Sequence, residues 1–277
     1  MMRNFTQMLI VALLFVLSTT TNAQESVLLK YGFKAGTTFL QETEVLQNTV
    51  QSMMGQEMKV IAEIKAVNGF NVESLSPEGN ATVLMTVKDI SIHTVAMGRD
   101  TSMQYSDLKD AARIVYSPEG KVVSTAKVDS SEAASVVNQL ETGNLIVLPG
   151  KEVKIGESWD ETKTEVKQAA AGAPFALEMA IDNKYTLAGK ENRNGKEYFK
   201  ITSSGTVALN GKGSQMGMEM FIEGNAKVEG YSLFDPIRQM IVYTENDTEM
   251  EMSIAISGPQ NMTVPMTQSI KTIVRVK

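Results

Sequence analysis

Cysteine is absent from this sequence of 277 residues, and histidine occurs once, at His93. Without cysteine there are no disulfides and no thiolate metal sites, and no lipid can be attached to a cysteine after signal cleavage. With no second histidine the usual zinc sites cannot be built, and no catalytic triad is apparent around His93, which we interpret as a strand-face residue. We therefore expect no cofactor and no metal site.

Basic clusters are also missing. The formal net charge is −6 at pH 7, and a mildly acidic surface disfavours nucleic acid and anionic membranes as partners. Carboxylates such as Glu219, Glu223, Glu249 and Glu251 are scattered over the polar faces of expected strands, where solvation explains them. The sequence thus favours a protein that is not an enzyme, with a carboxylate-dependent hydrolase as a remote alternative.

The first 23 residues have the organisation of a secretory signal peptide. Arg3 supplies the charge, residues 8–17 form an apolar core, and residues 18–23 are small and polar, with cleavage expected after Ala23. The apolar core is too short to span a bilayer. We therefore expect an exported protein, periplasmic or extracellular, with no transmembrane span in the mature chain.

Alternating apolar residues predict a chain made mainly of antiparallel β-strands. Between residues 58 and 66 every second residue is apolar, and lysine and glutamate dominate the positions between. Asn68-Gly69 and Asn194-Gly195 are typical of hairpin turns. From residue 81 the apolar positions are odd-numbered, but they become even-numbered at Ile90, so a bulge is expected near Lys88-Asp89.

One motif occurs twice and divides the chain. Lys34-Ala35-Gly36-Thr37-Thr38-Phe39 matches Lys154-Ile155-Gly156-Glu157-Ser158-Trp159 in its lysine, glycine and aromatic positions, 120 residues apart. Between them, an amphipathic stripe after Asp129 predicts a short helix that ends at Gly143. We predict two similar antiparallel β-sheet units, shaped as curled sheets or half-barrels, at residues 24–128 and 148–277. A connecting helix and linker at residues 129–147 would join them.

The chain contains 18 methionines, and three of them alternate along one expected strand face as Met216, Met218 and Met220. Thioethers bind soft metals such as Cu(I), yet no histidine is near, and methionine also fills irregular cores. A third interpretation is a soft cavity that holds an apolar ligand such as a lipid, which makes the three methionines candidate ligand-binding residues. Trp159, the sole tryptophan, is a candidate core anchor or ligand-stacking residue.

Three segments that follow the signal peptide carry a resemblance to known proteins: residues 28–39, residues 148–159 and residues 230–236, the last reading Gly230-Tyr231-Ser232-Leu233-Phe234-Asp235-Pro236. They resemble an uncharacterised family of secreted, β-rich bacterial proteins. The resemblance implies an exported location and a β fold, and it supplies no catalytic residues. We expect a non-catalytic protein that binds an apolar ligand or an envelope protein. The alternative is a structural or assembly factor of the cell envelope that binds no small ligand.

Overall fold

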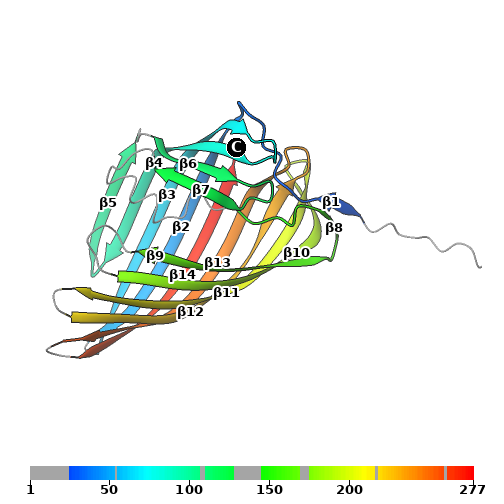
Figure 1. The fold of residues 1–277 in the computed structure, drawn as a ribbon. Helices are drawn as coiled ribbons and strands as arrows, with labels where there is room; N and C mark the ends of the chain where they lie inside the picture. The colour runs from blue at the N-terminus through cyan, green and yellow to red at the C-terminus, as the bar shows by residue number, and fades with distance from the viewer. Residues whose placement is uncertain are drawn as a thin grey trace, which may run out of the picture.

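The structure of the protein, a computed structural model, describes residues 25–53, 55–106, 110–127, 145–168, 175–215, 218–258 and 261–277. The predicted signal peptide at residues 1–23, the predicted helix at residues 129–143 and Met216 lie outside these residues. The described residues form strands, turns and loops (Figure 1). Within them there is no helix whose length and hydropathy would let it cross a membrane.

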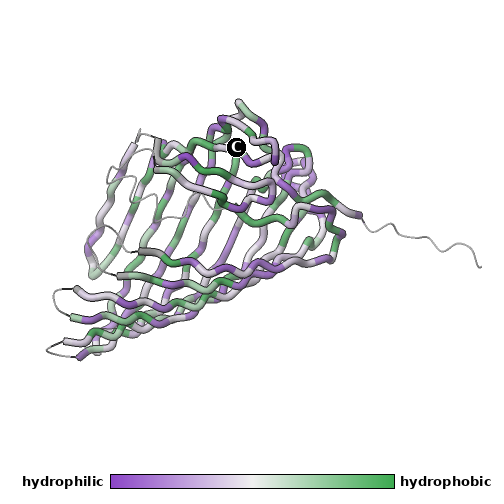
Figure 2. Tube along the Cα trace, viewed as in Figure 1, coloured by the Kyte–Doolittle hydropathy of each residue, from purple (hydrophilic) through white to green (hydrophobic). Residues whose placement is uncertain are grey.

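The strands are long, and their residues alternate in polarity. The first half contains β1 (Ser26–Leu28), β2 (Thr38–Met53), β3 (Gln56–Leu75), β4 (Ala81–Ala96), β5 (Arg99–Ser106), β6 (Asp110–Tyr116) and β7 (Val122–Lys127). The second half contains β8 (Glu152–Lys154), β9 (Ser158–Gln168), β10 (Phe175–Arg193), β11 (Lys196–Gln215), β12 (Met218–Asp235), β13 (Met240–Ser257) and β14 (Met262–Val276). Hydrophobic and hydrophilic residues alternate along them (Figure 2), which is the pattern of a sheet with one apolar and one solvated face.

The two halves of the chain join in one antiparallel sheet of twelve strands. Its order is β7-β6-β4-β3-β2-β14-β13-β12-β11-β10-β9, with β5 paired to β4, and β1 and β8 form a separate two-stranded sheet. The last strand, β14, pairs with β2, so that Val276 lies opposite Gln41. The prediction of a mainly β, antiparallel fold is therefore confirmed. The described strands are continuous across the expected boundary between two units, and the internal repeat stays a prediction.

The two turns of the repeated motif nevertheless have the same hydrogen bonds. The Gly36 N–H donates to the Val72 carbonyl at 2.8 Å, and the Gly156 N–H donates to the Leu187 carbonyl at 2.7 Å. Both glycines have a positive φ, of 79° and 92°, which side-chain-bearing residues rarely adopt. The lysine and glycine positions of the motif therefore mark two turns of one geometry, each leading into a long strand.

Two local predictions have opposite outcomes. Asn194-Gly195 forms a turn between β10 and β11, and both residues have positive φ values. Asn68-Gly69 was predicted as a turn, but this is wrong, because both residues lie inside β3. Asn68 pairs with Gln41 of β2 on one side and Val87 of β4 on the other. Pairing on both sides holds this segment extended and overrides its local preference for a turn.

The predicted bulge in β4 is confirmed. Val87 pairs with Asn68 and Asp89 pairs with Val67, so Lys88 is the extra residue of β4. The bulge shifts the phase of the strand by one residue. As a result Val87 and Ile90 both face the same hydrophobic cluster and are 1% exposed.

The sheet curls around its apolar face. One buried cluster comes from β3, β4 and β6. Another comes from β10 to β13 together with residues 29–31 and 148–153, and both clusters pack against Phe33 and Leu145. Because these strands are far apart in the sheet order, shared packing partners require a concave apolar face, as Figure 1 shows. We call this the inner face, and the opposite side the outer face.

Three segments close one end of the curl. Residues 25–34, 117–121 and 145–157, which we call the cap, are bonded to each other through backbone groups. The Tyr31 N–H donates to the Pro118 carbonyl at 2.8 Å, and the Leu148 N–H donates to the Glu119 carbonyl at 2.8 Å. Tyr31 and Leu148 are buried in the second cluster. The cap thus fills this end of the curl with packed side chains.

Candidate functional site

Methionine, isoleucine and valine side chains line the inner face at the end remote from the cap. Strand register brings Met252 opposite Met266, Ile254 opposite Val264 and Ile256 opposite Met262. The lining consists of Met58 and Val60 of β3, Met218, Met220 and Ile222 of β12, Met250, Met252, Ile254 and Ile256 of β13, and Met262, Val264 and Met266 of β14. Of these side chains only Val264 is fully buried, and the others remain partly accessible.

The outer face of the same strands carries the charges. Glu57, Lys59 and Lys65 of β3 are exposed, as are Glu219, Glu223, Lys227 and Glu229 of β12 and Asp247, Glu249 and Glu251 of β13. Lys65 and Glu63 form an exposed ion pair at 2.6 Å. This distribution makes the outer face a water-facing surface and leaves the inner face apolar.

The inner face contains a band of uncharged polar groups between the cap and the methionines. The side-chain amides of Gln47 and Gln268 both donate to the Thr49 hydroxyl, at 3.1 and 3.2 Å. Nearer the cap, Asn68 is fully buried, and neither atom of its amide has a hydrogen-bond partner among the described residues. From this band to the open end, the described inner-face residues of β2, β3, β4 and β10 to β14 are apolar or uncharged.

The predicted site residues lie at two separate places. Met218 and Met220 are part of the apolar lining, while Met216 lies outside the described residues. Trp159 lies at the opposite end, beside the cap. Its indole N–H donates to the Val147 carbonyl at 3.0 Å, and its ring stacks on Tyr185 at a centroid distance of 5.5 Å. The fold therefore does not bring Trp159 together with the methionines.

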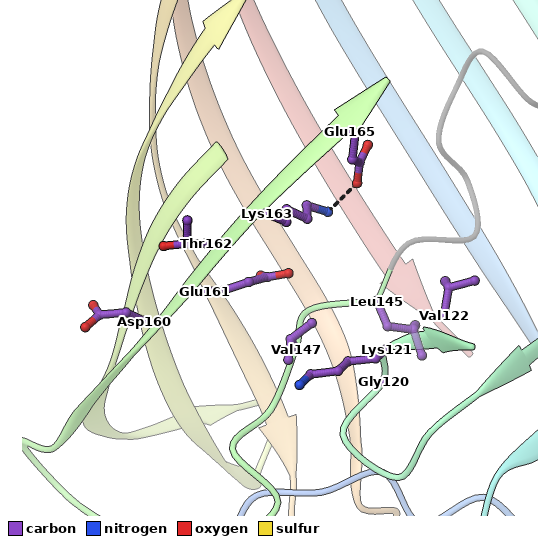
Figure 3. Close-up of a pocket in the computed structure, with 10 residues that line it drawn as sticks. All are labelled: Gly120, Lys121, Val122, Leu145, Val147, Asp160, Glu161, Thr162, Lys163 and Glu165. Atoms are coloured by element: carbon purple, nitrogen blue, oxygen red, sulfur yellow. Dashed lines mark ion pairs between the residues drawn. The ribbon is translucent and has the colours of Figure 1, made fainter. Parts of the chain in front are cut away.

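A cavity of about 440 Å³ lies between the two ends of the sheet order. One wall is the edge strand β9, and the other is formed by Lys121 and Val122 at the start of β7 with Leu145 and Val147 of the cap (Figure 3). The residues that line it are Gly120, Lys121, Val122, Leu145, Val147, Asp160, Glu161, Thr162, Lys163 and Glu165. Sequence reasoning had not identified this cavity.

The cavity collects charges of both signs. Lys163 forms an ion pair with Glu165 at 2.8 Å. The Tyr185 hydroxyl donates to Glu161 at 3.1 Å. Burial raises the pKa of Tyr185 well above its usual range, and the nearby Glu161 carboxylate raises it further. Tyr185 therefore remains a neutral hydrogen-bond donor, and it orients Glu161 at the cavity wall.

Among the residues that the structure describes, no three His, Asp or Glu side chains are grouped so that they could hold a metal ion. His93 lies on β4 and forms an exposed pair with Asp100 at 2.8 Å. The soft apolar lining and the charged cavity are two arrangements among the described residues with which a ligand could interact.

No family model matches the sequence, and no curated protein matches it. An outer membrane channel from Pseudomonas putida F1 is 10% identical with a TM-score of 0.25, over 89% of this chain and 97% of that chain. OccK7 (OpdD) of Pseudomonas aeruginosa is 6% identical with a TM-score of 0.28, over 87% and 99%. OprB of Pseudomonas putida is 8% identical with a TM-score of 0.22, over 86% and 92%. Scores this low carry no argument about fold or function.

Proposed function

We propose that the protein is a non-catalytic, exported lipid-binding protein whose inner face holds an acyl chain. The observation that carries the proposal is the partly accessible lining of methionine, isoleucine and valine on the inner face, opposite a charged outer face. Methionine is unbranched and polarisable, so it adapts to flexible apolar ligands. An extended apolar surface that is left accessible on one side of a sheet is typical of a binding site.

The dimensions of the lining fit one acyl chain. Met250 and Ile256 of β13 bound the lining along the strand and are six residues apart, a distance of about 20 Å at the usual rise. An acyl chain spans half of the hydrocarbon core of a bilayer, or about 15 Å. The uncharged band around Thr49 ends the lining on the side of the cap. The chain would therefore lie along the strands between the band and the open end.

The proposal is tested by lipid binding with a matched pair of variants on β13. The mature protein is incubated with a bacterial lipid extract and examined by native mass spectrometry, and the Kd of a fluorescent monoacylglycerol is then measured. Ile254→Lys places a charge in the lining and should weaken binding by about tenfold or more. Ser253→Lys, on the outer face of the same strand, should bind like the parent. Absence of any lipid adduct, or equal binding by the two folded variants, would refute the proposal.

A further inference from the structure

The edge strand β9 brings charged side chains to the inner face of the sheet. Register places Trp159 opposite Tyr185, Glu161 opposite Asn183, Lys163 opposite Ile181 and Glu165 opposite Met179. Each of these β10 partners faces the interior of the curl, so Glu161, Lys163 and Glu165 do as well. Figure 3 shows the three side chains on one side of β9, with Asp160 directed to the other side.

Among the described charged side chains on the inner side of this cavity, two have no ion-pair partner. Lys163 and Glu165 are already paired at 2.8 Å. Glu161 accepts a hydrogen bond from Tyr185 and forms no ion pair with another described residue, and the same holds for the Lys121 ammonium across the cavity. The cavity therefore offers one available carboxylate and one available ammonium, on opposite walls.

The apolar inner face of β10 and β11 lies between the cavity and the proposed acyl-chain site. Ile181 and Met179, which lie beside Lys163 and Glu165, pair in turn with Val207 and Leu209 of β11 on the inner face. Val122, Leu145 and Val147 add apolar contacts on the opposite wall. A ligand can thus have its charged part at the edge of the sheet and its apolar part along the inner face.

We propose that this cavity binds the zwitterionic head group of the lipid, with its ammonium at Glu161 and its phosphate at Lys121. This inference rests on the proposed function, because it needs an acyl chain on the inner face. A volume of about 440 Å³ lies in the usual range for small-ligand sites, about 300–1,000 Å³. An anionic or uncharged head group can form an ion pair with at most one of these two side chains. Charge complementarity therefore favours a zwitterionic head group.

The test compares three lipids of the same acyl chain below their micelle concentrations: lysophosphatidylethanolamine, lysophosphatidylglycerol and monoacylglycerol. The parent protein should prefer the zwitterionic lipid by about tenfold over monoacylglycerol, the ratio that two partly exposed ion pairs supply together, and by about threefold over lysophosphatidylglycerol, which lacks only the ammonium. The double variant Glu161→Gln with Lys121→Met should bind all three lipids with Kd values within about twofold of one another. Its Kd for monoacylglycerol should equal that of the parent.

A matched control is Glu178→Gln, at an exposed carboxylate on the outer face of the neighbouring strand β10 that does not line the cavity, which should keep the preference for the zwitterionic lipid. Equal binding of the three lipids by the parent, a preference for the anionic lipid, or an unchanged preference in the double variant would overturn the head-group assignment. These outcomes are distinct from failure of the proposed function, in which none of the three lipids binds the parent. If the double variant does not fold, the single variant Glu161→Gln should reduce the preference for the zwitterionic lipid over lysophosphatidylglycerol, and an unchanged preference overturns the assignment.

Discussion

Trp159 connects the edge strand β9 to the cap. Its indole N–H donates to the Val147 carbonyl, and its ring stacks on Tyr185 within the second hydrophobic cluster. Phe39, which occupies the position of Trp159 in the other copy of the motif, forms the same kind of stacked pair with Phe70, with centroids 5.0 Å apart. These contacts favour a structural role for the tryptophan over ligand stacking.

Trp159→Ala should therefore lower the free energy of unfolding by about 3–5 kcal/mol, because it removes a large ring and leaves the Val147 carbonyl without its donor. Trp159→Phe keeps most of the stacking and loses the hydrogen bond, so a loss of about 1–2 kcal/mol is expected. Urea titrations followed by far-UV circular dichroism measure both. An unchanged midpoint for Trp159→Ala would return Trp159 to the ligand-stacking interpretation.

Among the elements, those with a strong local pattern could be predicted from the sequence. The alternation in residues 58–66 and the change of phase at Ile90 gave a strand and a bulge that the structure contains. The turn predicted at Asn68-Gly69 was wrong, because pairing with β2 and β4 outweighs the local preference for a turn. The cavity could not be predicted from the sequence, because Lys121 and Glu161 come from opposite ends of the sheet order. Its one sequence signal was the run of charged residues at every second position, Glu161, Lys163 and Glu165.

The turn between β12 and β13 depends on Asp235, whose side chain is 1% exposed. Its carboxylate accepts hydrogen bonds from the Lys196 ammonium at 2.6 Å and from the amides of Ile237 and Arg238 at 3.0 and 3.2 Å. Burial alone would raise the pKa of Asp235, but these three donors outweigh it and hold the pKa below its ordinary value. The carboxylate therefore stabilises the folded chain in its ionised form.

Because the pKa is lower in the folded than in the unfolded chain, this stabilisation is complete above the unfolded value of about 3.9 and is lost as the pH falls through the folded value. Asp235→Asn should cost about 3 kcal/mol at pH 7, and its difference from the parent should shrink as the pH decreases below about 4. Urea titrations across this range measure the difference. Asp247→Asn, at an exposed carboxylate, is the control and should change stability little. A difference that is independent of pH would contradict the assignment.

For the whole molecule, the pairing of β14 with β2 determines whether the two halves of the chain unfold together. Eleven residue pairs, from Met266 with Gln51 to Val276 with Gln41, connect the strand nearest the C-terminus to the first half. Pro265 lies just before this stretch, opposite Ser253 of β13, where β14 has no partner in β2 and the missing N–H of proline is tolerated. Because the ladder is continuous at this position, we expect the two halves to unfold as one cooperative structure.

Thr272→Pro is expected to destabilise both halves together, because Thr272 pairs with Val45 on one side and Asn246 on the other, and proline removes a ladder hydrogen bond in a central strand. The loss should be about 3 kcal/mol or more. Trp159 fluorescence reports the second half and far-UV circular dichroism reports all strands, so the two urea transitions should coincide and shift equally. Val166→Pro, on the edge strand β9 that pairs only with β10, should have a much smaller effect. The halves would instead fold independently if the Trp159 fluorescence of Thr272→Pro kept the midpoint of the parent while circular dichroism showed two unfolding transitions.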